Sequence, residues 1–355
     1  CDKDAIIFCN GDNDTFPLWY NIEVEEERND VRACNLSYLQ TDWYIDQMKR
    51  PYYNSPGLPI SWDYADYMPG RNEIAWVENR LNAPLEVKKA FQFLNSNDPR
   101  TKRDGEGYIP SDQLFVFSPD SQKIMLKKAR RFTRSEMMVM EMLSTNEWKR
   151  PMYFAVTIGN DYHLGLDPYL ELTGLAYRIT PERNADGRPR VNTEVMYENM
   201  LHKFKYGNMN VPGIYIDENT MRMCRTHRMM FMELAEALYN EGKHDKCLEV
   251  LDFAEKMLPG YNIPYDYTSA TMAAYYYQLD EEDKGNAIMQ KVAENCAEYL
   301  AWGASLPKEH RASAQSTLQH QMAILGYVLQ NFERYEQKEL FNQYYDVYVQ
   351  YASVR

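Results

Sequence analysis

The sequence predicts an α/β domain with a parallel, βαβ-containing sheet, followed by an all-α stack of helical hairpins. Three observations lead to this prediction. The first forty residues read as strand, helix and strand, which is the signature of a parallel βαβ unit. From about Asp217 to the end, only helix signals occur. Residues 231–259 hold two apolar stripes at helical spacing with a turn between them. We therefore place the two domains at residues 1–207 and 208–355.

The βαβ unit begins with a continuous apolar run at residues 5–9, as expected of a strand that is covered on both faces. A polar loop follows it. Pro17 suits the first turn of a helix, with Asp14 or Thr15 as the cap. Residues 31–36 are expected to form the second strand of the unit.

The rest of the α/β domain shows weaker signals. Residues 51–70 read as a long irregular segment, and residues 184–190 as a surface loop. We expect further strands at residues 113–117 and 152–158, and helices at residues 85–94 and 137–143, the latter after the capping-box pair Thr133 and Glu136.

The helical domain is defined best by its first hairpin. Gly242 lies in the turn, where a residue free to adopt positive φ is favoured. The apolar stripes of the two helices are Phe231, Leu234, Ala235 and Leu238, then Cys247, Leu251, Ala254 and Leu258. Two more pairs are expected, at residues 268–279 with 287–300 and 318–330 with 336–351. Three pairs are about the minimum for a stable stack.

Composition and charge exclude some classes of protein. The 355 residues carry 39 basic and 52 acidic side chains, a net charge of −13, which argues against binding to nucleic acid. No run of about 20 apolar residues is available to span a bilayer. The chain has no initiator Met, so we expect a fragment of a longer protein.

Residues 123–134 contain six basic residues and no acid, which fits either a charged edge strand or a surface for anionic headgroups.

The six cysteines form no C-x-x-C pair, so neither a zinc ribbon nor a redox motif is indicated. We expect buried free thiols, because free Cys packs as a small hydrophobic residue. A bridge between Cys9 and Cys34 is the alternative, if both side chains face the same side of neighbouring strands.

The sharpest local feature is the polar loop after the first strand, at the sheet edge where open α/β sheets bind ligands. It contains Asp12, Asn13, Asp14 and Thr15. Asp12 and Asp14 are candidate ligands for a divalent cation, and the same groups can accept hydrogen bonds from sugar hydroxyls. The structural alternative is that Asp14 caps the helix and Asp12 braces the turn. The loop has no G-x-G-x-x-G pattern, so dinucleotide binding is not expected.

Three further polar residues are candidates for the same crevice. Asn35 and Asp42 follow the second strand, where they either face the ligand or form loop and cap hydrogen bonds. His163 follows the strand at residues 152–158, and a lone loop histidine is more often structural than catalytic. No catalytic set can be assigned from the sequence, so no catalytic residue is predicted.

Four segments together resemble one family of large bacterial multi-spanning membrane proteins of long-uncertain function. They are GDNDTFPLWY (11–20), VRACNLSYLQTDWYIDQMKRP (31–51), NEWKRPMYFAVTI (146–158) and LGLDPYLELTGLAYRI (164–179). The resemblance implies a hydrophobic amino-terminal half, similar to the eukaryotic transmembrane protein O-mannosyltransferases, and a soluble carboxyl-terminal half that includes this chain. It places the catalytic machinery in the membrane half. The first hairpin also resembles the tetratricopeptide repeat, with Cys247 where that repeat prefers Ala.

These inferences lead to one leading expectation. The chain is a non-catalytic, extracytoplasmic accessory domain of a membrane glycosyltransferase-like protein, at the periplasmic face of the inner membrane. Its expected partners are an acceptor polypeptide or glycan and its own membrane-embedded half, with no nucleic acid and no cofactor. The alternative is a sugar- or metal-dependent enzyme domain centred on Asp12 and Asp14.

Overall fold

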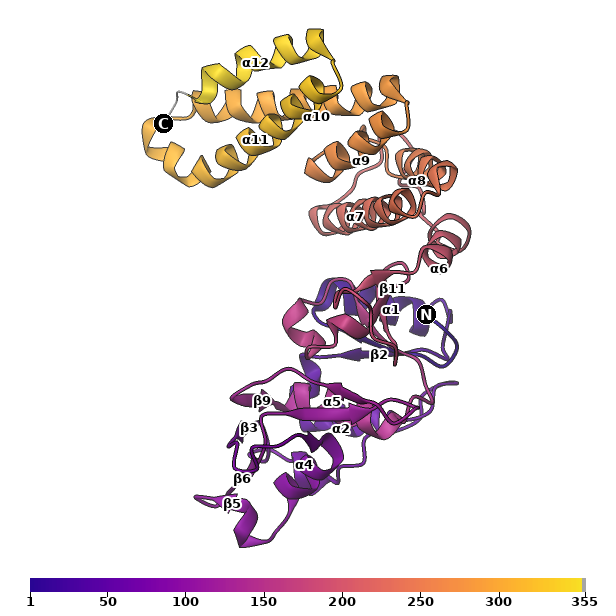
Figure 1. Ribbon diagram of the computed structural model, residues 1–355, viewed down its shortest axis with the longest axis vertical. Helices are drawn as coiled ribbons and strands as arrows, with labels where there is room; N and C mark the ends of the chain where they lie inside the picture. Colours follow the sequence, from indigo (N-terminus) through magenta and orange to yellow (C-terminus); the bar gives the residue numbers. More distant parts are fainter. Residues whose placement is uncertain (353–355) are drawn as a thin grey trace. The chain divides into compact units, whose positions relative to one another are not determined.

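The computed structural model describes residues 1–352 and divides into two compact units, Cys1–Asn192 and the chain from Thr193 onward (Figure 1). The first unit is built from three sheets and short helices. The second consists of consecutive helices. The predicted order, an α/β domain and then an all-α hairpin stack, is therefore confirmed.

The main sheet of the first unit has six strands in the order β13-β11-β12-β10-β1-β2. β1 (Ile6–Cys9) pairs in parallel with β2 (Arg32–Asn35) on one side and with β10 (Met152–Ala155) on the other. α1 (Asp12–Glu23) connects β1 to β2, which confirms the predicted βαβ unit. A hairpin, β11 (Leu170–Leu172) with β12 (Ala176–Ile179), adds antiparallel strands beyond β10. β13 (Arg190–Val191) completes the sheet beside β11.

Burial explains why these strands form. Every residue of β1, β2 and β10 is buried, as a parallel strand covered on both faces requires. The register places Cys34 opposite Phe8, and Cys9 opposite Asn35. Since successive side chains in a strand alternate between faces, Cys9 and Cys34 point to opposite sides and cannot form a bridge. Both are free thiols, as are the four other cysteines.

Two smaller sheets and four helices complete the first unit. In one sheet the order is β5-β6-β3-β9, and in the other β4-β7-β8. Their strands are β3 (Ile74–Val77), β4 (Leu85–Glu86), β5 (Lys102–Arg103), β6 (Glu106–Ile109), β7 (Leu114–Phe117), β8 (Lys123–Met125) and β9 (Arg131–Thr133). The remaining α-helices are α2 (Asp42–Met48), α3 (Tyr64–Tyr67), α4 (Val87–Asn95) and α5 (Arg134–Asn146). The 3₁₀ turns are Tyr38–Gln40, Pro99–Thr101, Asn160–His163 and Asp167–Tyr169.

Local predictions in this unit had mixed outcomes. The capping box before α5 is present, because Thr133 and Glu136 bond to each other's backbone amides. The cap predicted for α1 is wrong. The helix begins at Asp12 with Gly11 as its N-cap, so Asp14 and Thr15 lie inside the first turn and Pro17 within the helix. The two acidic residues of this turn, Asp12 and Asp14, favour the early start because they lie near the positive end of the helix dipole.

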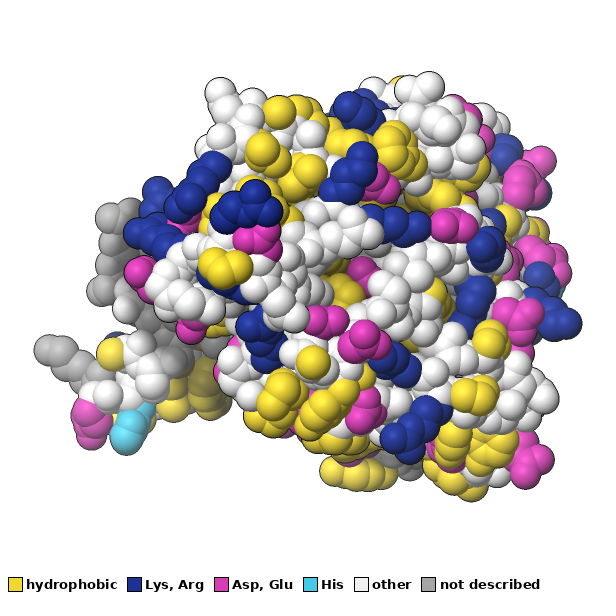
Figure 2. Space-filling model, turned by 90° about the horizontal axis from the view of Figure 1, so that it is seen from below, with side chains coloured by type: hydrophobic (Ala, Val, Ile, Leu, Met, Phe, Trp, Pro, Cys, Tyr) yellow, Lys and Arg dark blue, Asp and Glu magenta, His cyan; other side chains and the backbone are white. Residues whose placement is uncertain are grey.

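The basic run at residues 123–134 includes β8 and β9, each of which is an edge strand of one of the two smaller sheets. This agrees with the charged edge-strand interpretation, although Arg134 is buried and donates to the carbonyls of Gln40 and Arg71. Figure 2 shows one face of the molecule, on which basic, acidic and hydrophobic side chains are interspersed. On that face, charge of one sign does not gather into a single patch.

The second unit contains three antiparallel helix pairs in chain order (Figure 1). α6 (Thr193–Tyr197) and a π-helical segment (Glu198–Lys203) precede them. The pairs are α7 (Glu218–Asn240) with α8 (His244–Met257), α9 (Tyr267–Gln278) with α10 (Glu282–Ser305), and α11 (Lys308–Arg334) with α12 (Lys338–Ala352). Within the described residues, no helix is both long and apolar enough to cross a membrane.

The first hairpin matches its prediction closely. Gly242 adopts φ +74° in the turn between α7 and α8. The amide of Lys243 donates to the carbonyl of Leu238, which closes the carboxyl end of α7. Leu234 and Leu251, one from each predicted stripe, are both fully buried. The apolar spacing therefore identified the packed faces of both helices.

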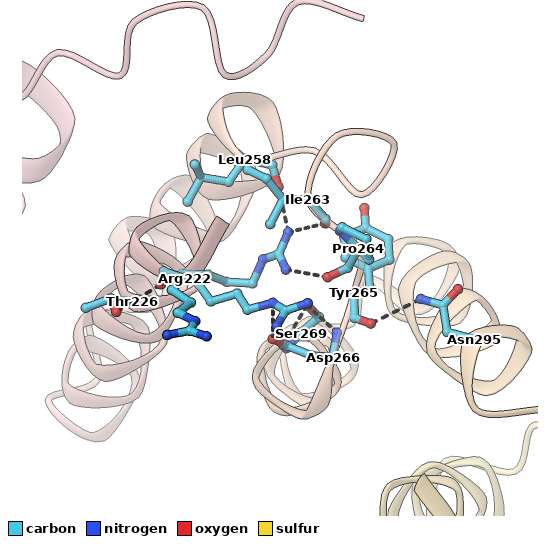
Figure 3. A network of polar contacts seen from close by, with 11 residues as sticks. Arg222, Thr226, Leu258, Ile263, Pro264, Tyr265, Asp266, Ser269 and Asn295 are labelled. Atoms are coloured by element: carbon cyan, nitrogen blue, oxygen red, sulfur yellow. Dashed lines mark hydrogen bonds and ion pairs between the residues drawn. The ribbon is translucent and has the colours of Figure 1, made fainter. Parts of the chain in front are cut away.

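A buried arginine fixes the connection from α8 to α9 (Figure 3). Arg228 on α7 is 1% exposed and donates to the carbonyls of Leu258, Ile263 and Pro264 at 2.8–3.0 Å. Its guanidinium lies 5.4 Å from the ring centroid of Tyr265. Burial lowers the pKa of Arg228, and the nearby carboxylates of Asp266 and Glu255 act in the opposite direction. One side chain thus supplies hydrogen-bond donors to three backbone carbonyls that lie outside regular helices and sheets.

We expect Leu251→Ala to lower the free energy of unfolding by roughly 2–5 kcal/mol, because the side chain is fully buried between helices. Urea unfolding followed by far-ultraviolet circular dichroism measures this loss. A loss below about 0.5 kcal/mol would contradict the packing of the first hairpin.

Arg228→Met should lower the free energy of unfolding by roughly 2–4 kcal/mol, because three carbonyls, two of them in buried hydrogen bonds, lose their donor. Arg222→Met is the matched control on the same helix. Arg222 is exposed and forms an ion pair with Glu218 in the preceding turn, so its loss should cost less than about 0.5 kcal/mol. Equal effects of the two substitutions in urea titration would show that the carbonyl contacts do not matter.

Candidate ligand-binding edge of the main sheet

The predicted site lies where three parallel strands end at one edge of the main sheet. After β1 the chain turns to one side to build β2, and after β10 it turns to the other side to build β12. Such a switch point is where open α/β sheets form a ligand crevice. Asp14 follows β1 and Thr157 follows β10, and the Thr157 hydroxyl donates to the Asp14 carboxylate at 2.7 Å. The two strands on either side of the switch point are therefore joined through side chains.

Asp14 has a structural set of partners. The carboxylate oxygen that accepts from Thr157 also accepts from the backbone amide of Asn10 at 3.0 Å. Its other oxygen lies 3.3 Å from the Thr15 hydroxyl. Asp14 occupies the third helical position and reaches back before the N-cap, as the acidic residue of a capping box does. It therefore braces the turn, although it is not the cap itself.

Thr15 and Asn35 lie below this edge, inside the protein. The Asn35 side-chain amide donates to the Thr15 hydroxyl at 2.8 Å, and its oxygen accepts from the amide of Tyr38. The Thr15 hydroxyl also lies 3.2 Å from the sulfur of Cys9. Thr15 and Asn35 are no more than 1% exposed, so they tie β1, α1 and β2 together. The structure links Asp14 and Asn35 through the Thr15 hydroxyl, with Asn35 buried at the end of β2 and not facing a crevice.

Asp42 and His163 have separate partners. Asp42, at the start of α2, accepts a hydrogen bond from the hydroxyl of Tyr64 at 3.0 Å. This bond raises the pKa of Tyr64. His163 is 1% exposed, with its Nδ1 atom 2.9 Å from the carboxylate of Asp167. Its ring packs against Phe154 and Tyr177. Both contacts fit the structural interpretation of this histidine.

Asp12 and Asn13 remain on the surface of the edge. Among the described residues, no group of three or more His, Cys, Asp or Glu side chains is arranged to hold a metal ion. Asp12 shares its helix face with Phe16, one turn further along α1, because residues four apart are neighbours on a helix. Phe16 is 48% exposed.

Phe16 begins a row of aromatic rings that the sequence interpretation missed. Its ring centroid lies 5.7 Å from that of Trp19, which stacks on Tyr38 at 6.0 Å with an interplanar angle of 14°. Tyr38 in turn contacts Trp43, whose side chain is 55% exposed. We call Phe16, Trp19, Tyr38 and Trp43 the ring ladder. Its sequence signal is the large apolar residues on the outer side of the first predicted helix, which a surface helix does not need for folding.

The fold defines an α/β unit followed by a stack of helical hairpins. The model of the family described as TMEM260-associated domain 2 matches residues 1–197, which is more than half of the chain. The chain belongs to this family. The match fits the resemblance to relatives of the transmembrane O-mannosyltransferases. It contains the whole first unit and α6. No curated protein and no solved structure shows significant similarity to the chain.

We expect Asp14→Ala to lower the free energy of unfolding by roughly 0.5–2 kcal/mol, because the Asn10 amide and the Thr157 hydroxyl lose their acceptor. Asp12→Ala, at an exposed position two residues earlier, should change stability by less than about 0.5 kcal/mol. Calorimetry of the wild-type chain with millimolar Ca²⁺, Mg²⁺ and Mn²⁺ should give no binding heat. Tight binding that Asp12→Asn abolishes would instead assign a metal site to this edge.

Proposed function

We propose that this chain is a non-catalytic, extracytoplasmic accessory region of a bacterial membrane glycosyltransferase-like protein, and that the ring ladder binds the glycan of an acceptor. The observation that carries the proposal is the ladder itself, a row of rings beside surface polar groups at a sheet edge. Its ends, Phe16 and Trp43, are exposed, while Trp19 and Tyr38 between them are partly buried. Family membership is consistent with an accessory domain.

The chemistry of the ladder suits a sugar. The face of a pyranose ring carries C–H groups that pack against an aromatic ring, whose face is electron-rich. Sugar hydroxyls then need acceptors and donors around the stacked ring, and the exposed Asp12 and Asn13 offer both on the helix turn next to Phe16. Exposed aromatic residues with polar neighbours mark interaction sites more often than large apolar side chains scattered singly do.

The assignment as non-catalytic is supported by how the buried polar groups are used. Asp14, Thr15 and Asn35 bond to one another and to neighbouring backbone, and His163 bonds to Asp167. These side chains hold loops and strands in place. In the proposed whole protein, the membrane-embedded half performs sugar transfer, while this region lies at the periplasmic face and needs no cofactor.

The helix stack is proposed to contact the acceptor polypeptide or the membrane-embedded half. A hollow of about 210 Å³ lies between α9 and α11. Its walls include Tyr275, Tyr327, Gln330 and Arg334, which combine rings with amide and guanidinium donors. Such a wall can bind an extended peptide through both its side chains and its backbone.

Titration of the chain with neutral trisaccharides of glucose and of mannose, followed by ligand-observed NMR, tests the glycan role. Trp43→Ala and Phe16→Ala should each weaken binding at least about tenfold, since stacking on either ring is lost. Trp302→Ala is the matched control, because Trp302 is 48% exposed on α10 of the other unit. Unchanged affinity in both ladder variants would contradict the proposal.

The enzyme alternative predicts a different outcome. Turnover of a lipid-linked or nucleotide-activated sugar by the chain, lost on Asp12→Ala, would replace the accessory role by a catalytic one. We expect no turnover.

A further inference from the structure

A second concave site lies at the opposite edge of the main sheet, where β10 begins. It is a hollow of about 270 Å³ beside Pro151 and Met152. Small-molecule pockets start at roughly 300 Å³, so this hollow has room for a single ring with its substituents. Six of its lining residues decide its chemistry: Pro119, Trp148, Lys149, Arg150, Arg178 and Pro181.

The turn that carries Trp148 is strained. Glu147 and Trp148 follow α5 and both have left-handed backbone conformations, with φ +49° and +62°. A bulky residue rarely adopts such a conformation, and strained residues persist where the surroundings hold them, often at ligand sites. Asn146 brackets this turn, because its side chain accepts from the amide of Arg150 and donates to the carbonyl of Arg150.

The indole of Trp148 is also held in position. Its N–H donates to the carbonyl of Phe117 at 2.7 Å, so the ring cannot rotate freely. The side chain is only partly buried and forms part of the pocket wall. The strained turn therefore contributes a fixed indole to the wall of the hollow, together with the apolar rings of Pro119 and Pro181.

The charged residues of the lining are all basic. Lys149 and Arg178 form ion pairs with Glu147 and Asp2, neither of which is among the residues of the wall. Arg150 donates to the carbonyls of Asp4, Pro56 and Gly57 and to the Ser55 hydroxyl. Within the described residues it has no carboxylate partner within ion-pair distance. In a chain of net charge −13, the charged side chains that line this hollow are all cations, two of which pair with carboxylates outside its wall.

We propose that this hollow binds an anionic monosaccharide, with the sugar ring against Trp148 and the phosphate or carboxylate near Lys149 and Arg178. The inference is independent of the ring ladder, which lies at the other edge of the sheet. The indole of Trp148 and the cations of Lys149 and Arg178 line the same hollow. Its volume of about 270 Å³ is too small for an oligosaccharide.

Calorimetry of the whole chain tests this with glucose 1-phosphate, glucuronate, glucose and inorganic phosphate. The two sugar anions should bind, more weakly at 0.5 M than at 0.05 M NaCl, because salt screens the exposed cations. Glucose and inorganic phosphate should each bind at least about tenfold more weakly than the better sugar anion. The stronger of glucose 1-phosphate and glucuronate identifies the anionic group that the site prefers.

Lys149→Gln combined with Arg178→Gln should weaken the better sugar anion at least about tenfold. Lys89→Gln combined with Arg100→Gln is the control, since both cations are exposed in the same unit and pair with Glu86 and Asp98, outside the lining of the hollow. Trp148→Phe should weaken the sugar anion and leave inorganic phosphate unchanged. Absence of heat from both sugar anions at 10 mM ligand, or full affinity in the double pocket variant, would overturn the proposal.

Discussion

The first unit depends on the parallel pairing of β1 with β10 on one side and β2 on the other. All three strands are fully buried, so their backbone groups must be satisfied within the sheet. Parallel pairing also brings their carboxyl ends to one edge. Asp14 and Thr157 meet there, and Asn35 lies below them against Thr15, because three segments far apart in sequence end at the same edge. The opposite edge gathers the segments that enter the strands, including the turn at Trp148.

Buried arginines play the same role in both units. Arg228 satisfies carbonyls of the α8–α9 connection, and Arg134 satisfies carbonyls of two loops in the first unit. Each has five N–H donors in a fixed plane, so a single side chain can replace secondary structure over an irregular segment. The cost is the desolvation of the charge, which lowers the pKa of both groups. Irregular connections are therefore ordered without a sheet or helix of their own.

Periodic helices and continuously apolar strands were predictable from sequence, and polar strands were not. The hairpin of α7 and α8 repeats an apolar stripe over several turns, and the four residues of β1 are all apolar. β5 and β6, in contrast, lie in a polar stretch and form by pairing with each other. Tertiary pairing stabilises them, and a single sequence does not reveal it.

The candidate edge of the main sheet also differs in part from what the sequence predicts. Asp12, Asp14 and Asn35 were expected to face one crevice, and the structure instead links Asp14 to Asn35 through the buried Thr15 hydroxyl while Asp12 stays on the surface. The early start of α1 was not predictable from the cap pattern, since Gly11 can serve as an N-cap without a side-chain bond. The ring ladder escaped prediction because Phe16 and Trp43 are far apart in sequence and their exposure is a property of the folded surface.

Burial of the cysteines has a consequence for the environments that the chain tolerates. Desolvation raises the pKa of Cys9, Cys247 and Cys296 to about 12, so these thiols stay protonated at neutral pH. Oxidants and disulfides react with the thiolate, and access to these sulfurs is closed as well. Apart from Cys1, which is exposed, the cysteines of the folded chain are therefore protected in an oxidising compartment. Oxidation of the five buried cysteines becomes a measure of unfolding, because only an opened core exposes their sulfurs.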